Sequence, residues 1–168
     1  MPVTVKVTGG DKAAEALAEI DRRLDGKHAL NVGFLAGNFY EETGESVAMV
    51  AAIQNFGAPA RGIPPRPFFT NMVNKESPGW GAALGAALKA CDYDAERALA
   101  LMGEVISGQL QQSIVDTNDP PLAPSTLRSR GVDPGTKYNP SDAATFGAKP
   151  LIRTGKMRNS VAYEVKSA

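Results

Sequence analysis

The stretch from Asp94 to Ile114 reads DAERALALMGEVISGQLQQSI. Apolar residues recur in it about every 3.6 positions, as they do along one face of an amphipathic helix. Asp94 precedes the first of them and can accept hydrogen bonds from the free N–H groups of a first helical turn. The sequence therefore predicts the longest helix of the chain here. The apolar stripe consists of Ala95, Ala98, Leu99, Met102, Val105, Ile106, Leu110 and Ile114.

Other helices are predicted on both sides of this stretch. Apolar residues at steps of four, three and four predict a helix after Asp11, which can cap it, ending at Gly26. Ser46 is expected to cap a second helix, which is apolar on most sides, is therefore expected to be buried, and ends at Gly57. A short helix is expected over 71–75, and Ser77-Pro78 is expected to begin a new one. The stripe of the first helix consists of Ala13, Leu17, Ile20 and Leu24.

Three segments alternate apolar and polar residues with the period of a half-buried strand. They are Val3 to Val7, Leu30 to Phe34, and Val161 to Val165. Strands at both ends of the chain could pair and tie the termini into one sheet. The sequence therefore predicts an α+β fold, with a small, mostly antiparallel sheet packed against several helices and long Pro-rich loops.

A chain of 168 residues is one domain by length, so we expect residues 1–168 to form a single α+β domain. Two extended arms are expected within it, at about 58–69 and 115–150. Prolines fix φ and keep such segments extended. One short helix is expected in the second arm, from Ser125 after Pro124, and one capped turn is expected from Thr154 through Arg158.

The residue content favours no catalytic or metal site. The formal charge is zero, the only cysteine is Cys91 and the only histidine is His28. We interpret Cys91 as a core residue and His28 as a solvent-facing turn residue, and we find neither metal-ligand spacing nor a general acid–base pair. The expectation is a protein that is not an enzyme, with no cofactor, no metal and no membrane segment, made in a reducing cytoplasm.

Several motifs, in order, carry a resemblance to a known family. Val32-Gly33-Phe34 ends a strand, Asn55-Phe56-Gly57 ends a helix, and Pro65-Arg66-Pro67-Phe68 follows. The C-terminal part reads PLAPSTL from Pro121 and KPLIRTGKMRNS from Lys149. Together these motifs resemble the virion-morphogenesis and tail-completion proteins of Mu-like and other long-tailed bacteriophages. Asn55 departs from the pattern, where Glu is frequent, and this change is expected to alter a subunit contact.

The resemblance implies a structural virion protein of the neck or tail terminus, assembled in the host bacterial cytoplasm. Such subunits form a six-fold or twelve-fold homo-oligomeric ring around the DNA channel. The ring completes the tail or joins it to the head, in contact with the connector or portal, the tail tube or the sheath. The alternative is a monomeric binding module that attaches a peptide or nucleic acid through its Pro-rich arms and basic C-terminal segment.

A ring needs contacts between unlike surfaces of neighbouring copies, and Pro-rich arms lose little entropy when they bind. We therefore expect the subunit interface to include Arg66, Pro67, Phe68, Phe69, Leu122, Pro124 and Leu127. Arg66 is expected to form a salt bridge within the chain or to a neighbour; the alternative is a solvated arginine. A second set, expected to contact DNA phosphates or an acidic partner, is Lys149, Arg153, Lys156 and Arg158. The alternatives are that the arms pack across their own domain and that the basic residues form a solvated face.

Overall fold

A computed structural model describes residues 10–24, 26 and 28–167 of this chain. It confirms the α+β fold, with an antiparallel pair of strands against helices. The strand expected at Val3 to Val7 lies outside the described residues. In chain order the elements are α1 (Gly10–Leu24), β1 (His28–Phe34), α2 (Val47–Phe56), η1 (Pro59–Arg61), α3 (Phe68–Ala90), α4 (Ala95–Asp116), α5 (Pro124–Ser129), η2 (Ala143–Ala148), α6 (Lys156–Asn159) and β2 (Val161–Ser167).

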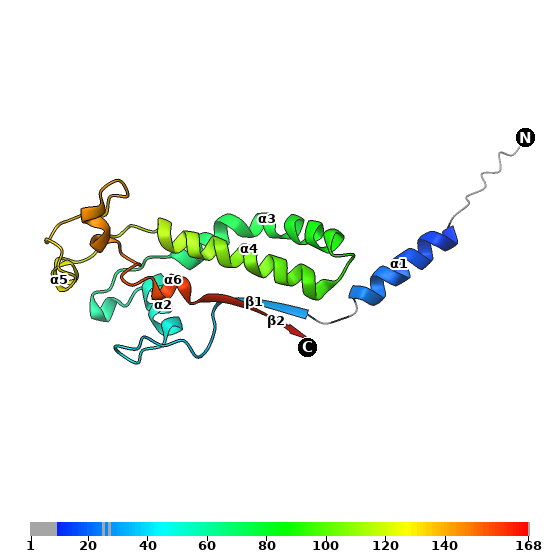
Figure 1. Cartoon of the computed structure of the whole chain (residues 1–168), viewed down its shortest axis with the longest axis horizontal. Helices are drawn as coiled ribbons and strands as arrows, with labels where there is room; N and C mark the ends of the chain where they lie inside the picture. Colours follow the sequence, from blue (N-terminus) through cyan, green and yellow to red (C-terminus); the bar gives the residue numbers. More distant parts are fainter. Residues whose placement is uncertain (1–9, 25, 27, 168) are drawn as a thin grey trace, which may run out of the picture.

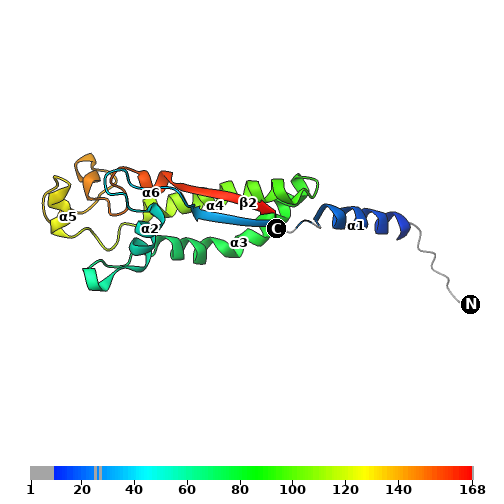
Figure 2. The same ribbon diagram turned by 90° about the horizontal axis from the view of Figure 1, so that it is seen from below.

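Helix α4 is the centre of the molecule. Helix α3 packs along it, and both strands pack against another of its sides (Figures 1 and 2). Asp94 caps α4 as predicted, because its carboxylate accepts a hydrogen bond from the Arg97 N–H at 3.0 Å. Of the predicted stripe, Ala98, Met102, Ile106, Leu110 and Ile114 are buried, whereas Val105 is exposed; Gly103 and Ser107 beside the stripe are buried as well.

Helix α3 corrects two expectations. It runs for 23 residues without a break at Ser77-Pro78, and it exceeds the 22 residues of α4. Pro78 removes one backbone N–H from the helix, and it is exposed, so that water can reach the carbonyl left free. Side-chain bonds to α4 hold the helix on both sides of this proline. Gln109 accepts a hydrogen bond from the Trp80 indole at 2.9 Å and donates one to Glu76 at 3.3 Å.

Strands β1 and β2 pair antiparallel along their whole length. Leu30 lies opposite Val165, Val32 opposite Tyr163, and Phe34 opposite Val161. The three apolar residues of β1 pack against the core that α4 forms. The closing strand therefore pairs with β1 in the structure.

The core lies where α4 meets α2, the first turn of α3 and α6. Its largest fully buried side chains are Phe68, Leu110, Ile114 and Val47, and Leu127 of α5 is fully buried outside this cluster. Phe34 meets Phe68 edge to face, with ring centroids 6.2 Å apart. Phe68 thus joins the strands to the helices.

Two surfaces are more apolar than the sequence indicates. Helix α2 is buried on one side only, because Met49 is 64% exposed and Phe56 is 74% exposed; the prediction of a helix buried on most sides is wrong. Ser46 precedes α2 without a side-chain capping bond. Helix α1 extends away from the body in both views (Figures 1 and 2), and Leu17 on its apolar stripe is 67% exposed. Asp11 lies inside the first turn of α1, not ahead of it.

The two expected arms are folded loops. Ala58 and Ile63 pair around η1, so 58–63 turns back on itself and only 64–67 stays extended. The segment 117–150 holds α5 and η2. Thr154 accepts a hydrogen bond from the Lys156 N–H at 3.3 Å, but the residue that caps α6 is Gly155, so the predicted cap at Thr154 is off by one residue.

Gly103 gives a direct test of how β2 packs on α4. A Cβ placed on Gly103 would lie 2.3 Å from Cδ2 of Tyr163, whereas nothing lies within 4 Å of one on Gly108. We predict that Gly103→Ala lowers the free energy of unfolding by about 1–3 kcal/mol, because the Tyr163 ring must shift. Gly108→Ala on the same helix is the control and should raise it by up to about 1 kcal/mol. Urea unfolding of both variants checks this; equal effects would contradict the packing.

Candidate assembly surface

Asn55, at the end of α2, caps the start of α3. Its Oδ1 accepts hydrogen bonds from the N–H groups of Phe69 at 3.0 Å and Thr70 at 3.2 Å. Its Nδ2 donates to the Thr70 hydroxyl at 3.0 Å. Asn55 is buried, and both polar atoms of its amide are bonded to α3 of its own chain. The expected effect of this residue on a subunit contact is therefore corrected: Asn55 sets the position of α3 within its own chain.

Arg66 holds the long loop that follows α4. Its Nε donates to the Pro120 carbonyl at 2.8 Å and its Nη2 donates to the Pro121 carbonyl at 3.0 Å. Its Nη1 donates to the side-chain oxygen of Gln54 at 3.1 Å. Arg66 is only 4% exposed, and burial lowers its pKa. The expected salt bridge is thus replaced by carbonyl contacts within the chain, and the solvated alternative is wrong as well.

Arg130 holds the segment that leads into α6 in the way that Arg66 holds the loop after α4. Its Nη1 donates to the Lys149 carbonyl at 2.8 Å and to the Gly147 carbonyl at 3.2 Å, and its Nη2 reaches the Pro150 carbonyl at 3.4 Å. Burial lowers the Arg130 pKa, and the positive charges of Arg153 and Arg66 lower it further. Arg130 and Arg66 therefore lie close enough to repel each other, and backbone carbonyls compensate that repulsion.

The expected interface residues divide into enclosed and accessible ones. Phe68 and Leu127 are buried in the chain's own core, as is Arg66. The prediction that these three residues form the subunit interface is therefore corrected, because a side chain enclosed by its own fold is not accessible to another copy. The accessible ones are Pro67, Phe69 and Leu122, which are partly buried, and Pro124, which is exposed. Their role in an interface stays a prediction.

The four basic residues do not form one surface. Lys149 is 8% exposed, with its ammonium 3.9 Å from the centre of the Tyr138 ring. This enclosure excludes a DNA contact by Lys149 in this fold. Lys156 approaches Glu41 at 3.8 Å, an ion pair of little energetic weight because the carboxylate is exposed. Arg153 and Arg158 are exposed and remain candidates for contact with DNA or a partner.

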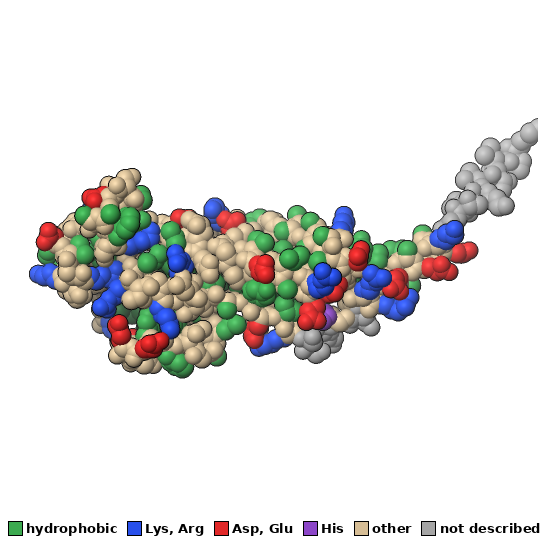
Figure 3. All heavy atoms as spheres, viewed as in Figure 1, with side chains coloured by type: hydrophobic (Ala, Val, Ile, Leu, Met, Phe, Trp, Pro, Cys, Tyr) green, Lys and Arg blue, Asp and Glu red, His purple; other side chains and the backbone are tan. Residues whose placement is uncertain are grey.

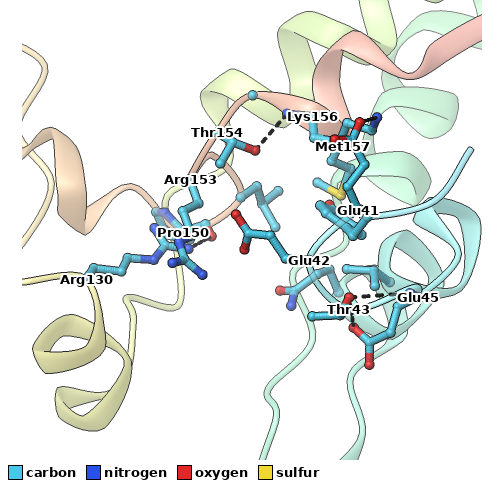
Figure 4. Close-up of a pocket in the computed structure, with 15 residues that line it drawn as sticks. Glu41, Glu42, Thr43, Glu45, Arg130, Pro150, Arg153, Thr154, Lys156 and Met157 are labelled. Atoms are coloured by element: carbon cyan, nitrogen blue, oxygen red, sulfur yellow. Dashed lines mark hydrogen bonds and ion pairs between the residues drawn. The ribbon is translucent and has the colours of Figure 1, made fainter.

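A cleft of about 410 Å³ lies between these basic residues and the loop before α2. One wall carries Glu41, Glu42 and Glu45, and the other carries Arg130 and Arg153 (Figure 4). Glu42 points from its loop into the cleft, toward the arginines. At this end of the space-filling view, acidic and basic side chains adjoin (Figure 3). Because the two signs face each other, the cleft offers no single-sign surface for a phosphate backbone.

An apolar groove on α2 was not predicted from the sequence. It is lined on one wall by Ala48, Ala51, Ala52, Asn55 and Phe56, and on the other by Phe34, Phe68 and Phe69. Phe56 stands at its rim and is largely exposed. An exposed apolar groove of this kind is a candidate for contact with another protein. One residue in the sequence could have indicated this groove. Phe56 is the last residue of its helix, next to Gly57, where the chain turns, so the core does not cover its side chain.

No catalytic arrangement emerges among the described residues. They contain no group of three or more His, Cys, Asp or Glu side chains placed to hold a metal ion. Cys91 is buried, as predicted, but His28 begins β1 and is partly buried, which corrects its interpretation as a solvent-facing turn residue. No helix in the described ranges has the length and apolar character needed to span a bilayer.

Comparisons with family models, curated proteins and solved structures find no match to this chain. The resemblance carried by the sequence motifs therefore stays a prediction.

The carbonyl contacts of Arg66 are testable. We predict that Arg66→Met lowers the free energy of unfolding by about 2–4 kcal/mol, because the Pro120 and Pro121 carbonyls lose a charged donor. Protease cleavage between residues 117 and 123 should rise with it, since the loop is no longer held.

Arg61→Met is the matched control for Arg66→Met. Arg61 ends η1, five residues before Arg66, and it is exposed. Its replacement should change the free energy of unfolding by no more than about 0.5 kcal/mol. Urea unfolding measures both variants, and equal losses would contradict the role given to Arg66.

The cap on α3 gives a second test. Asn55→Ala removes the acceptor for two N–H groups and should lower the free energy of unfolding by about 1–2 kcal/mol. Asn55→Asp keeps an acceptor at the positive end of the helix, and the Thr70 hydroxyl can donate to it, so its loss should stay below about 1 kcal/mol. Thermal and urea unfolding rank the variants. An alanine variant as stable as the aspartate one would show that the cap contributes nothing.

Proposed function

We propose that this chain is a structural protein of the bacteriophage virion, a subunit of a ring at the neck or tail terminus. The ring completes the tail or joins it to the head around the DNA channel. The observation that carries the proposal is the amount of surface that the chain leaves uncovered. A subunit of this shape needs neighbours.

The surface can be compared with that of a compact protein. A monomer of 17.7 kDa exposes roughly 7,900 Å² when it folds compactly. The accessible surface of this chain is 11044 Å², roughly 3,100 Å² more. Setting aside roughly 150 Å² for each residue outside the described part still leaves more than about 1,000 Å². That excess is of the size that one partner buries in a stable protein interface.

The motifs behind the family resemblance also support the proposal, because they meet in space. Asn55, from one motif, caps the helix that Phe68, from the next, begins. Arg66 binds the carbonyls of Pro120 and Pro121, where the third motif starts. Motifs that are far apart in the sequence are thus connected in the fold. Their contacts hold segments together and contain no reacting group, which is in keeping with a scaffold.

A closed ring requires that each copy present two different surfaces, one to each neighbour. The elongated body has two different ends, with α1 at one end and the loop end, containing α5, at the other (Figure 1), which supports the proposal. The segment between α4 and β2 carries the accessible candidates Leu122, Pro124, Arg153 and Arg158. In the proposed ring Leu122 and Pro124 are left for other neck and tail proteins, and Arg153 and Arg158 for such proteins or for DNA phosphates in the channel.

Native mass spectrometry of the purified full chain tests the proposal. We predict a closed oligomer of about six or twelve copies that forms as concentration rises, in line with the tail and portal symmetries that the resemblance implies. Double-stranded DNA should not be needed for assembly. A chain that stays monomeric at every concentration and retards DNA in a gel would contradict the ring and favour the binding module.

A further inference from the structure

Helix α1 has an apolar face that its own fold leaves uncovered. Ala13, Leu17 and Leu24 on the stripe are exposed, and Ile20 is partly so. No other element within the described residues packs closely on α1. A hydrogen bond joins it to the body near its C-terminal end, from the Arg23 guanidinium to the Asp92 carbonyl at 2.8 Å. An amphipathic helix in water gains most of its stability only when such a face is buried.

The groove on α2 is a second uncovered apolar surface. Its volume is about 220 Å³, roughly the space of one or two leucine side chains. Ala48 and Ala52 line it on the helix, and Phe56 and Phe69 flank it. A concave apolar surface between aromatic walls is the type that receives a helix through residues three, four and seven apart. The apolar stripe of α1 has this spacing.

The two surfaces do not meet within one chain. Helix α1 lies beyond the His28 end of β1, whereas the groove includes Phe34 at the other end. Seven residues of strand separate them by roughly 20 Å. A helix folded back over that distance would cover the outer face of the sheet formed by β1 and β2. On that face Asn31, Glu164 and Lys166 form polar bonds. Such a face gives an apolar stripe nothing to bury against.

Charge at the ends of the two helices favours one orientation, although Arg22 and Arg23 also pair with Glu19 on α1 itself. Arg22 and Arg23 are in the last turn of α1, whereas Glu41, Glu42 and Glu45 precede α2. Packing the helices antiparallel brings these arginines to these glutamates. Exposed charges of this kind add little affinity but set register and orientation.

We propose that α1 of one copy packs antiparallel in the α2 groove of the next copy. The stripe of α1 then covers Phe56 and Met49 on α2 and the accessible Phe69 on the facing wall of the groove. Because α1 and the groove are different surfaces, the contact is heterologous and repeats from copy to copy. The inference deepens the proposed function, and it rests on that function for the closure of the contacts into a ring.

Disulfide trapping tests the contact in the full chain. Cysteines are placed singly at Leu17 on α1 and at the exposed Ala52 on α2, after Cys91→Ala removes the native thiol. Mixing Leu17→Cys with a mass-tagged Ala52→Cys should give the mixed dimer on oxidation. Glu15→Cys, on the opposite face of α1, is the matched control and should give at least about tenfold less mixed dimer, because its thiol points away from the groove. Equal yields would overturn the proposal.

Point variants measure the same contact without cross-linking. Leu17→Asp and Phe56→Asp change side chains that are 67% and 74% exposed, so the fold should tolerate both. Each should weaken association at least about tenfold, because an apolar contact is lost and a charge is buried. Glu15→Gln should leave association unchanged. Circular dichroism of each variant verifies that it is folded, and a folded Leu17→Asp variant that assembles as the unmodified chain does would overturn the proposal.

Three further outcomes distinguish failure of the contact between α1 and α2 from failure of the ring. In a variant that carries both Leu17→Cys and Ala52→Cys, a disulfide within monomers would place α1 on its own groove and overturn the proposal. Oligomers without the mixed disulfide would overturn it too, but would leave the ring standing. A chain that never associates would overturn both.

Discussion

Two arginines hold together the part of this protein that lacks regular secondary structure. Arg66 is buried and donates to the Pro120 and Pro121 carbonyls, and the half-buried Arg130 donates to carbonyls of the segment before α6. The planar guanidinium offers several donors in fixed directions, which a lysine does not. Burial lowers the pKa of both side chains, since each charge is removed from water. The loops remain packed on the body because releasing them would leave these charges without partners.

This packing determines which surfaces are left for other molecules. The proline-rich segments, which look like free arms in the sequence, are folded onto their own chain, and Phe68 and Leu127 are inside. Among the described residues the most exposed large apolar side chains lie on α1 and α2 and are Phe56, Leu17 and Met49. In the proposed ring, contact between copies therefore moves from the loops to two helices. The exposed Arg153 and Arg158 stay available for DNA or for another virion protein.

Elements whose pattern is local can be predicted from the sequence. Periodicity and the Asp94 carboxylate predict α4, and alternation predicts β1 and β2. Pro78 looks like the start of a helix, but side chains on α3 and α4 bond on both sides of it and keep α3 continuous. The partners of Arg66 could not be predicted, because every residue has a backbone carbonyl and the sequence does not show which of them a side chain will reach. Helix α2 looks buried because apolar side chains surround it, and a pattern cannot tell a core from an uncovered groove.

In the proposed assembly the folded loops leave two helical surfaces free, and copies of the chain join through these surfaces in a closed ring. Electron cryomicroscopy of the assembled full-length protein tests this claim most directly. We expect a closed ring with a central channel, in which α1 of each subunit lies on α2 of its neighbour. Rings joined through the loops around Pro124, with α1 free or lying on its own subunit, would contradict it.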